Sequence, residues 1–274
     1  DGIVGGLAAS AMRLGRSSVQ DYLDSRPVVA ELEAIGRAIA LAEATGCSLH
    51  IVHVSTGRGA ALVGAARARG VDVTAETCPH YLVFTDEDVE QMGAIAKCAP
   101  PLRSVADQES LWSAVRGGEI DLIASDHSPS LPSMKSGDDF FAVWGGISGC
   151  QHLLAAMISA GIPRGASLPD IARLTSGTIA RRFRLAGKGG IAVGNDADLT
   201  WLRYRDPVPI PASRVRYRHP ASVWDDVPLA VEAAGTIMRG RIVYRDGELL
   251  DQPAGRLLKP DVTATRNWPF DERD

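Results

Sequence analysis

Polar side chains that could bind a metal follow three short apolar segments of this 274-residue sequence. His53 ends the first segment, His80 comes shortly after the second, and Asp126 comes almost directly after the third. Imidazole nitrogen and carboxylate oxygen are both ligands that zinc accepts in proteins. If the segments are neighbouring strands, His53 and Asp126 can converge on one metal ion.

Each of these residues also has an ordinary structural interpretation. A histidine among apolar strand residues is often hydrogen-bonded within the core, and an aspartate after a strand often caps a helix or a turn. His50 shares neither the parity nor the edge position of His53, so we interpret it as structural. Ser125, Asp126 and His127 are consecutive and cannot form a catalytic triad by themselves. The metal hypothesis therefore depends on how the strands are arranged.

The elements that would position these side chains alternate between strand and helix. Residues 48–54, 71–77 and 120–124 are short, apolar and rich in β-branched side chains, which predicts strands. Apolar spacing and capping signals predict helices between them, over residues 32–45, 60–69 and 106–116, and a short one after the capping box at 85–88. This alternation predicts a parallel sheet covered by helices. The polar residues then gather at its carboxyl edge, where catalytic groups sit in a (β/α)8 barrel.

The last third of the chain has a different pattern. From Gly189 onward, short strands and turns predominate, with turns expected at Gly240 and at Asp246-Gly247. We therefore expect two regions: residues 1–188 belong to the α/β part, and residues 189–274 form a small β region followed by a polar tail at 261–274.

Composition narrows the classes of protein that the chain can belong to. Hydrophobic residues make up 45% and charged residues 23% of the chain, which is typical of a globular domain. The formal net charge of −4 argues against a protein that grips nucleic acid, and no apolar run is long enough to span a membrane. The four cysteines are far apart, which indicates reduced, buried thiols in a cytoplasmic protein.

Four motifs, in the same order, resemble those of the cyclic amidohydrolases. They are LHIVHVS at 49–55, ETCPHYL at 76–82, KCAPPLR at 97–103 and SDHSP at 125–129. This family includes allantoinases, dihydropyrimidinases or hydantoinases, and dihydroorotases. The segment WGGISGCQ at 144–151 is most similar to allantoinases, since hydantoinases typically carry an Asn-Gly pair there. DSRP at 24–27 and the segments 194–198 and 239–241 extend the resemblance over nearly the whole chain.

The resemblance implies an α/β fold, a metal-dependent (β/α)8 TIM barrel with a small β-sandwich subdomain. Two zinc ions would be held by an HxH pair, a carboxylated lysine, two later histidines and an aspartate. His53 matches the second of these later histidines, and Asp126 matches the aspartate, which also serves as the catalytic acid and base.

The same resemblance implies roles around the metal. The backbones of two loops would hold the substrate ring, and two histidines would lie beside the metal ligands without binding the metal. The loop residues are Cys98, Ala99, Gly145 and Gly146, and the histidines are His80 and His127.

The chain also departs from the family pattern. It contains no HxH motif and no lysine at a strand end ahead of His53, and only three barrel strands are expected. We therefore expect the C-terminal half of the barrel, without the other metal ligands and the carboxylated lysine.

The function implied by the resemblance is hydrolysis of allantoin to allantoate in purine breakdown. It would involve a small cyclic ureide substrate and a homotetramer, without nucleic-acid or membrane partners. A dihydropyrimidinase or hydantoinase, and a non-catalytic scaffold subunit of this family, are the alternatives.

Overall fold

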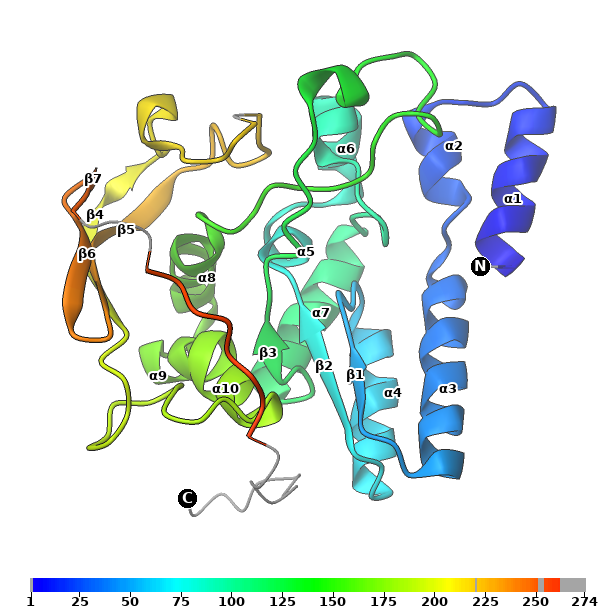
Figure 1. Cartoon of the computed structure of the whole chain (residues 1–274). Coiled ribbons are helices and arrows are strands. Elements are labelled where there is room, and N and C mark those ends of the chain that lie inside the picture. Colours follow the sequence, from blue (N-terminus) through cyan, green and yellow to red (C-terminus); the bar gives the residue numbers. More distant parts are fainter. Residues whose placement is uncertain (1, 220, 251–253, 262–274) are drawn as a thin grey trace. The chain divides into compact units, whose positions relative to one another are not determined.

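The computed structural model describes residues 2–219, 221–250 and 254–261, and its chain forms two compact units (Figure 1). The first unit contains Asp1–Gln151 and Arg216–Trp224, and the second contains His152–Val215 and Asp225–Asp274. The boundary predicted after residue 188 lies inside the second unit, and the division into barrel and β-sandwich portions stays a prediction. Residues 262–274 of the predicted tail lie outside the described residues.

A three-stranded parallel sheet forms the centre of the first unit, as the sequence predicted. Its order is β1 (Leu49–Ile51), β2 (Val73–Thr77) and β3 (Leu122–Ile123). On β2, Val73, Thr74, Ala75 and Thr77 are buried, and Glu76 is half-buried. Both faces of the central strand are therefore largely covered.

All three strands are shorter than predicted, for local reasons. The N–H of Val71 donates to the carbonyl of Ala66 at 3.2 Å, so this residue completes the preceding helix and does not enter β2. His53 has a φ of 42°, which an extended strand cannot accommodate, and β1 therefore ends before it. Apolar character predicted where the strands lie, but this hydrogen bond decides where β2 begins and this backbone angle decides where β1 ends.

Helices precede and connect the strands of the first unit. The helices are α1 (Gly2–Arg13), α2 (Val19–Asp24), α3 (Val28–Thr45), α4 (Gly57–Ala68), α5 (Pro79–Val83), α6 (Asp86–Met92) and α7 (Val105–Gly117), with the 3-10 turns η1 (Gly93–Ala96) and η2 (Pro132–Lys135). The predicted capping box of Thr85 and Asp88 begins α6. The predicted stop at Gly46 ends α3 in the left-handed conformation.

Helix α4 packs between α3 and α7 and against β2. A Cβ atom at Gly57 would lie 2.5 Å from the carbonyl oxygen of Ser110 in α7, so only glycine allows this approach. Val63 and Ala66 of α4, with Leu111 and Trp112 of α7, are almost completely buried. This packed layer supports the strands whose carboxyl ends carry the candidate site.

The second unit combines short helices with an antiparallel sheet. The sheet has the order β4 (Leu199–Val208), β5 (Leu229–Met238), β6 (Arg241–Arg245) and β7 (Glu248–Leu249). The helical segments are α8 (Leu153–Gly161), η3 (Ile162–Arg164), α9 (Leu168–Ala172), the π-helical turn η4 (Arg173–Gly177), α10 (Thr178–Arg182) and η5 (Ala212–Arg214). The hairpin turns predicted at Gly240 and at Asp246-Gly247 are present, and all three residues have positive φ.

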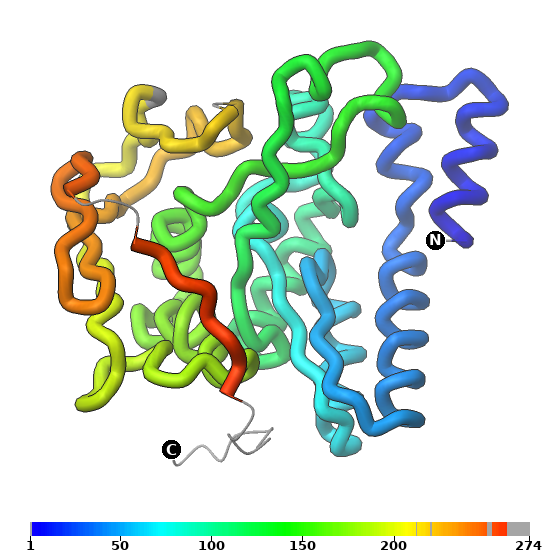
Figure 2. The backbone as a smooth tube through the Cα atoms, viewed as in Figure 1, coloured from blue at the N-terminus to red at the C-terminus, as the bar shows by residue number. Residues whose placement is uncertain are grey.

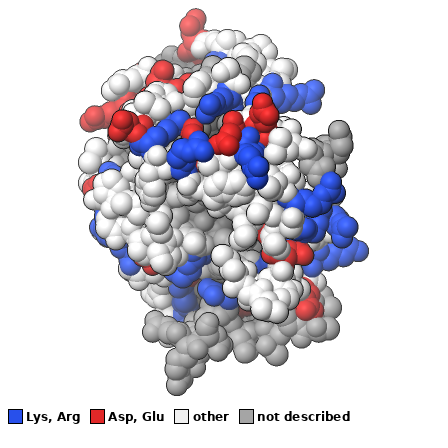
Figure 3. Space-filling view, turned by 90° about the vertical axis from the view of Figure 1, so that its left-hand side faces the viewer, with Lys and Arg blue, Asp and Glu red and all other residues white. Residues whose placement is uncertain are grey.

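Two further features of the second unit are visible in the figures. The last described segment, red in Figure 2, runs beside the region after α10, where the Asp261 N–H donates to the Arg184 carbonyl at 2.8 Å. Basic and acidic side chains are interspersed on the face drawn in Figure 3. Glu232 of β5 pairs with Arg205 of β4 at 2.8 Å and with Arg214 of η5 at 3.1 Å, so charges of opposite sign compensate each other there.

Candidate active site

His53 and Asp126 follow β1 and β3, the two strands that flank β2. Each adopts a φ of 42°, in the left-handed region that costs a non-glycine residue about 1–2 kcal/mol. His53 is half-buried and Asp126 is exposed. Two strained residues of metal-binding type at the same edge of a sheet are characteristic of a functional site, because their surroundings must hold them there.

Backbone bonds from β2 hold the turn that follows His53. The Val54 N–H donates to the Glu76 carbonyl at 2.8 Å, and the Thr77 hydroxyl donates to the Val54 carbonyl at 2.6 Å. Val54 and Thr77 are fully buried, so neither bond competes with water. The strand that carries the ETCPHYL motif therefore fixes the position of the candidate ligand on the neighbouring strand.

A buried ion pair supports the same turn from the other side. The carboxylate of Glu31 accepts the Ser55 N–H at 3.0 Å and lies 3.5 Å from the guanidinium of Arg103. Arg103 also donates to the Ser55 hydroxyl at 3.0 Å and to the Arg26 carbonyl at 2.6 Å. These contacts link the DSRP and KCAPPLR motifs to the turn after His53. Neither Glu31 nor Arg103 was predicted to have a role, although one lies in the first turn of α3 and the other ends the KCAPPLR motif.

Burial keeps His80, Cys78 and Cys98 uncharged at neutral pH. Burial lowers the pKa of His80 to about 3, and the nearby His53 imidazole adds to this effect. Burial raises the pKa of Cys98 to about 12, and it also raises that of Cys78, with Asp126 contributing to both rises. The thiols remain protonated at neutral pH and are not nucleophiles.

The two predicted substrate loops lie side by side. The Gly146 N–H donates to the Lys97 carbonyl at 2.8 Å, and the Tyr22 hydroxyl donates to the Cys98 carbonyl at 2.9 Å. A Cβ atom at Gly146 would lie 2.6 Å from the carbonyl oxygen of Ser128, so this backbone position requires glycine. The structure thus brings the loops of Cys98 and Gly146 together, while their role in substrate binding stays a prediction.

His127 and His50 take different positions from His53. The Nδ1 atom of His127 accepts the Gly149 N–H at 3.1 Å, which orients its ring beside the substrate loops. His50 contacts the Thr74 hydroxyl at 2.7 Å and the Glu76 carboxylate at 3.0 Å. The interpretation of His50 as a structural residue agrees with these contacts.

The cysteines agree only partly with the sequence analysis. All four are free thiols, as predicted, and Cys78 and Cys98 are buried. Cys47 and Cys150 are exposed, so the expectation of burial was wrong for them. Cys47 lies between a helix cap and a strand, and Cys150 lies in the turn before His152, where the chain does not enter the core.

The donors at this edge fit a zinc site in type. His53 offers nitrogen and Asp126 offers oxygen, whereas a catalytic zinc commonly has three protein ligands. Within the part of the chain that the structure describes, no group of three or more such residues could hold a metal ion. The Nε2 atom of the buried His80 has no hydrogen-bond partner among the described residues. These residues can therefore supply part of a metal centre.

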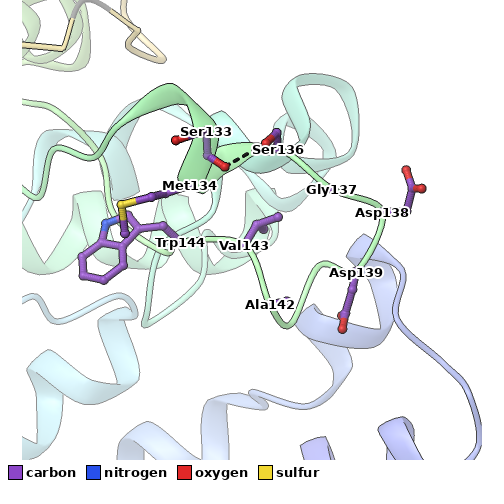
Figure 4. A pocket seen from close by; sticks show the side chains of 9 residues that line it. All are labelled: Ser133, Met134, Ser136, Gly137, Asp138, Asp139, Ala142, Val143 and Trp144. Carbon is purple, nitrogen blue, oxygen red and sulfur yellow. Dashed lines mark hydrogen bonds between the residues drawn. The ribbon is translucent and has the colours of Figure 1, made fainter.

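A cavity of about 360 Å³ lies next to one of the substrate loops. Figure 4 shows that its lining comes from a single segment that runs from η2 to the residue before Gly145. The lining residues are Ser133, Met134, Ser136, Gly137, Asp138, Asp139, Ala142, Val143 and Trp144. The Trp144 N–H donates to the Met134 carbonyl at 2.8 Å, which closes this segment on itself. None of the predicted site residues lines this cavity.

The helices in the described part of the chain do not combine the length and apolar character needed to cross a bilayer.

Comparison with solved structures shows the same fold in cyclic amidohydrolases. The L-hydantoinase (dihydropyrimidinase) from Arthrobacter aurescens matches with a TM-score of 0.89 and 32% identity, over 92% of this chain and 57% of that chain. The D-hydantoinase (dihydropyrimidinase) from Thermus sp. matches with a TM-score of 0.86 and 25% identity, over 91% and 56%. The mixed α/β architecture is therefore that of TIM-barrel amidohydrolases, as predicted.

Comparison with curated sequences gives higher identities. The allantoinase of Rubrobacter xylanophilus is 54% identical over 260 residues, which cover 94% of this chain and 57% of the relative. The allantoinase of Solibacter usitatus is 49% identical over 255 residues, which cover 93% and 56%. The chain thus spans about half the length of the curated relatives it matches. The profile of the amidohydrolase family matches residues 29–244, and the chain belongs to this family.

Proposed function

We propose that this chain forms part of an enzyme that hydrolyses a cyclic amide, opening allantoin to allantoate. The observation that carries this proposal is the 54% identity to an allantoinase over a segment that includes His53, Asp126 and both substrate loops. Identity to the hydantoinases of similar fold is 32% or lower in the two structures compared above. This difference favours allantoin over the rings on which those enzymes are named to act.

His53 and Asp126 are the residues of this chain that would hold a divalent metal, and their donor types favour zinc. When bound, the metal would make a water molecule acidic enough to attack at neutral pH. Asp126 would take the proton from that water while the water oxygen forms a bond with the ring carbonyl carbon. The ring C–N bond would then break, and Asp126 would pass the proton to the departing nitrogen.

His53 would serve as a neutral ligand in this reaction and would not transfer protons. The bonds from Val54 to β2 would keep its ring in place. The backbones at Cys98–Ala99 and Gly145–Gly146 would hold the substrate ring, and N–H groups there would stabilise the negative charge that develops on the carbonyl oxygen. His80 would remain uncharged beside the ligands, since burial holds its pKa near 3.

The decisive experiment uses the protein as its own gene encodes it, with allantoin, hydantoin and dihydrouracil as substrates. We expect allantoin to give the highest kcat/KM and Asp126→Asn to lower kcat for allantoin by about a thousandfold or more, since it removes both a ligand and the proton carrier. Asp226→Asn, which neutralises another exposed carboxylate, serves as the matched control and should retain full activity.

Other outcomes would decide against the proposal. Near-normal turnover by Asp126→Asn would exclude the assigned mechanism. A preference for hydantoin or dihydrouracil would favour the second candidate, a hydantoinase or dihydropyrimidinase, which the TM-score of 0.89 to such an enzyme supports. A folded protein that opens none of the rings would favour a scaffold subunit. The homotetramer, the second metal ion and the cytoplasmic location remain predictions beside this proposal.

A further inference from the structure

Lys97 directly precedes the Cys98–Ala99 loop, and its side chain crosses to the other substrate loop. Its ammonium group donates to the Val143 carbonyl at 2.5 Å and to the Phe141 carbonyl at 3.3 Å. The residue is only 4% exposed, and its Nζ atom lies 4.6 Å from the centre of the Tyr22 ring. A lysine so deeply buried is costly unless its charge is compensated, here by carbonyl dipoles and an aromatic ring.

Lys135 makes the reciprocal connection. It ends η2, in the segment that leads to Gly145–Gly146, and its ammonium group donates to the Gly146 carbonyl at 2.7 Å. It also donates to the carbonyls of Ala94 at 2.8 Å and Ile95 at 3.3 Å, in η1 just before Lys97. An ammonium group has three N–H donors, and all three are directed at backbone oxygens.

The two lysines therefore cross-link the segments of the two substrate loops, Lys97 from the first segment and Lys135 from the second. The Gly146 N–H bonds to the carbonyl of Lys97, and the Gly146 carbonyl accepts from Lys135, so both polar groups of this glycine backbone are engaged. Lys97 is buried and Lys135 is half-buried, and this burial lowers the pKa of each lysine to about 8. In this environment a hydrogen bond from a charged donor is stronger than one at the surface.

We propose that Lys97 and Lys135 are positioning residues that set the separation and orientation of the Cys98–Ala99 and Gly145–Gly146 backbones. The inference rests on the proposed function, in which these backbones hold the substrate ring. Backbone groups stabilise a transition state only when they are already oriented, and a displacement of about 1 Å can cost about a hundredfold in rate. The lysines act through the loops and do not contact the substrate.

The test compares Lys135→Met with Lys188→Met in the protein as its own gene encodes it. Methionine has similar length but no donor, so the carbonyls of Ala94, Ile95 and Gly146 lose their shared partner. Lys188 is the matched control because it also ties a turn together, through Asp196 at 2.8 Å and Asp198, but in the second unit. We expect kcat for allantoin to fall about tenfold or more in Lys135→Met, with a smaller change in KM, and neither to change in Lys188→Met.

Amide hydrogen exchange gives a second measurement that does not depend on turnover. The Gly146 N–H bonds to the Lys97 carbonyl and should exchange slowly in the wild type. We expect Lys135→Met to speed exchange in a peptide spanning residues 145–149 at least tenfold, while peptides from α4 keep their protection. If Lys135→Met does not fold, Lys135→Gln retains an uncharged amide with two N–H donors and should show the same changes to a smaller extent.

The two measurements separate failure of this inference from failure of the proposed function. Unchanged exchange at residues 145–149 in the variants would show that Lys135 does not hold the loop. Faster exchange with an unchanged kcat would show that loop position does not matter for the reaction, and would also overturn the inference. A wild-type protein that opens none of the three rings would instead refute the proposed function. The proposed effect of the lysines on the reaction would then fail as well.

Discussion

At the residue scale, the clearest mark of the site is backbone strain. His53 and Asp126 share a φ of 42°, a conformation that glycine adopts at no steric cost. A histidine and an aspartate remain there because of their side chains, which the proposed mechanism uses as ligands. This conformation lowers the stability of the folded chain, and the loss can be measured.

Substitution by glycine and by alanine at Asp126 should separate strain from side-chain loss. Both variants remove the carboxylate, but only alanine retains the Cβ atom that the left-handed conformation disfavours. We expect Asp126→Gly to be more stable than Asp126→Ala by about 1 kcal/mol in denaturant unfolding, with both inactive. The same comparison at Arg184, whose φ is 53°, should show a similar stability difference without loss of activity. Equal stability of the glycine and alanine variants at both positions would contradict this account.

At the element scale, the site depends on how closely α4 and α7 pack behind the strands. Gly57 is the contact point, since a Cβ atom there would lie 2.5 Å from a backbone oxygen of Ser110. Backbone cannot move aside as a flexible side chain can, so the helices would have to separate. The sequence alone does not reveal this role of Gly57, because its partner Ser110 is 53 residues away.

Alanine substitutions at two glycines of α4 should have opposite effects. Gly57→Ala should lower the free energy of unfolding by about 2 kcal/mol or more, because it forces overpacking against α7. Gly64→Ala should raise it by about 0.5–1 kcal/mol, because its Cβ would meet the Glu119 side chain at an ordinary 3.5 Å and alanine favours a helix. Thermal and denaturant unfolding of the two variants measure both effects. A loss of stability in both would show that the α4–α7 contact is not the cause.

At the scale of the whole molecule, buried histidines make stability depend on pH. His152 precedes α8 and is fully buried, and burial lowers its pKa from 6.5 to about 4. Between these values the unfolded chain binds a proton that the folded chain does not, so the free energy of unfolding falls as pH falls. This one residue should lower the free energy of unfolding by about 3 kcal/mol between pH 7 and pH 4.

The variant His152→Gln tests this contribution, because glutamine does not titrate. Between pH 7 and pH 4, the free energy of unfolding should fall by about 3 kcal/mol less in this variant than in the wild type. Denaturant unfolding at each pH measures this difference. An unchanged pH dependence would show that His152 gains its proton in the folded protein as readily as in the unfolded chain.

The sequence by itself determined the family, the order of strands and helices, and the types of the candidate ligands. It could do so because apolar periodicity, caps and short motifs such as SDHSP are local properties of the chain. The lengths of the strands were predicted less well, since the left-handed turn at His53 is not visible in residue types.

Only the tertiary structure revealed the groups that hold the site together. Lys135 is 38 residues from Lys97, and Glu31 is 72 residues from Arg103, so no local pattern joins either pair. Glu31 meets Arg103, and each lysine reaches the other loop's segment, because the fold brings distant turns of the first unit together. Buried charges need partners wherever the fold supplies them, and for this reason the residues that orient the loops became apparent only from the folded chain.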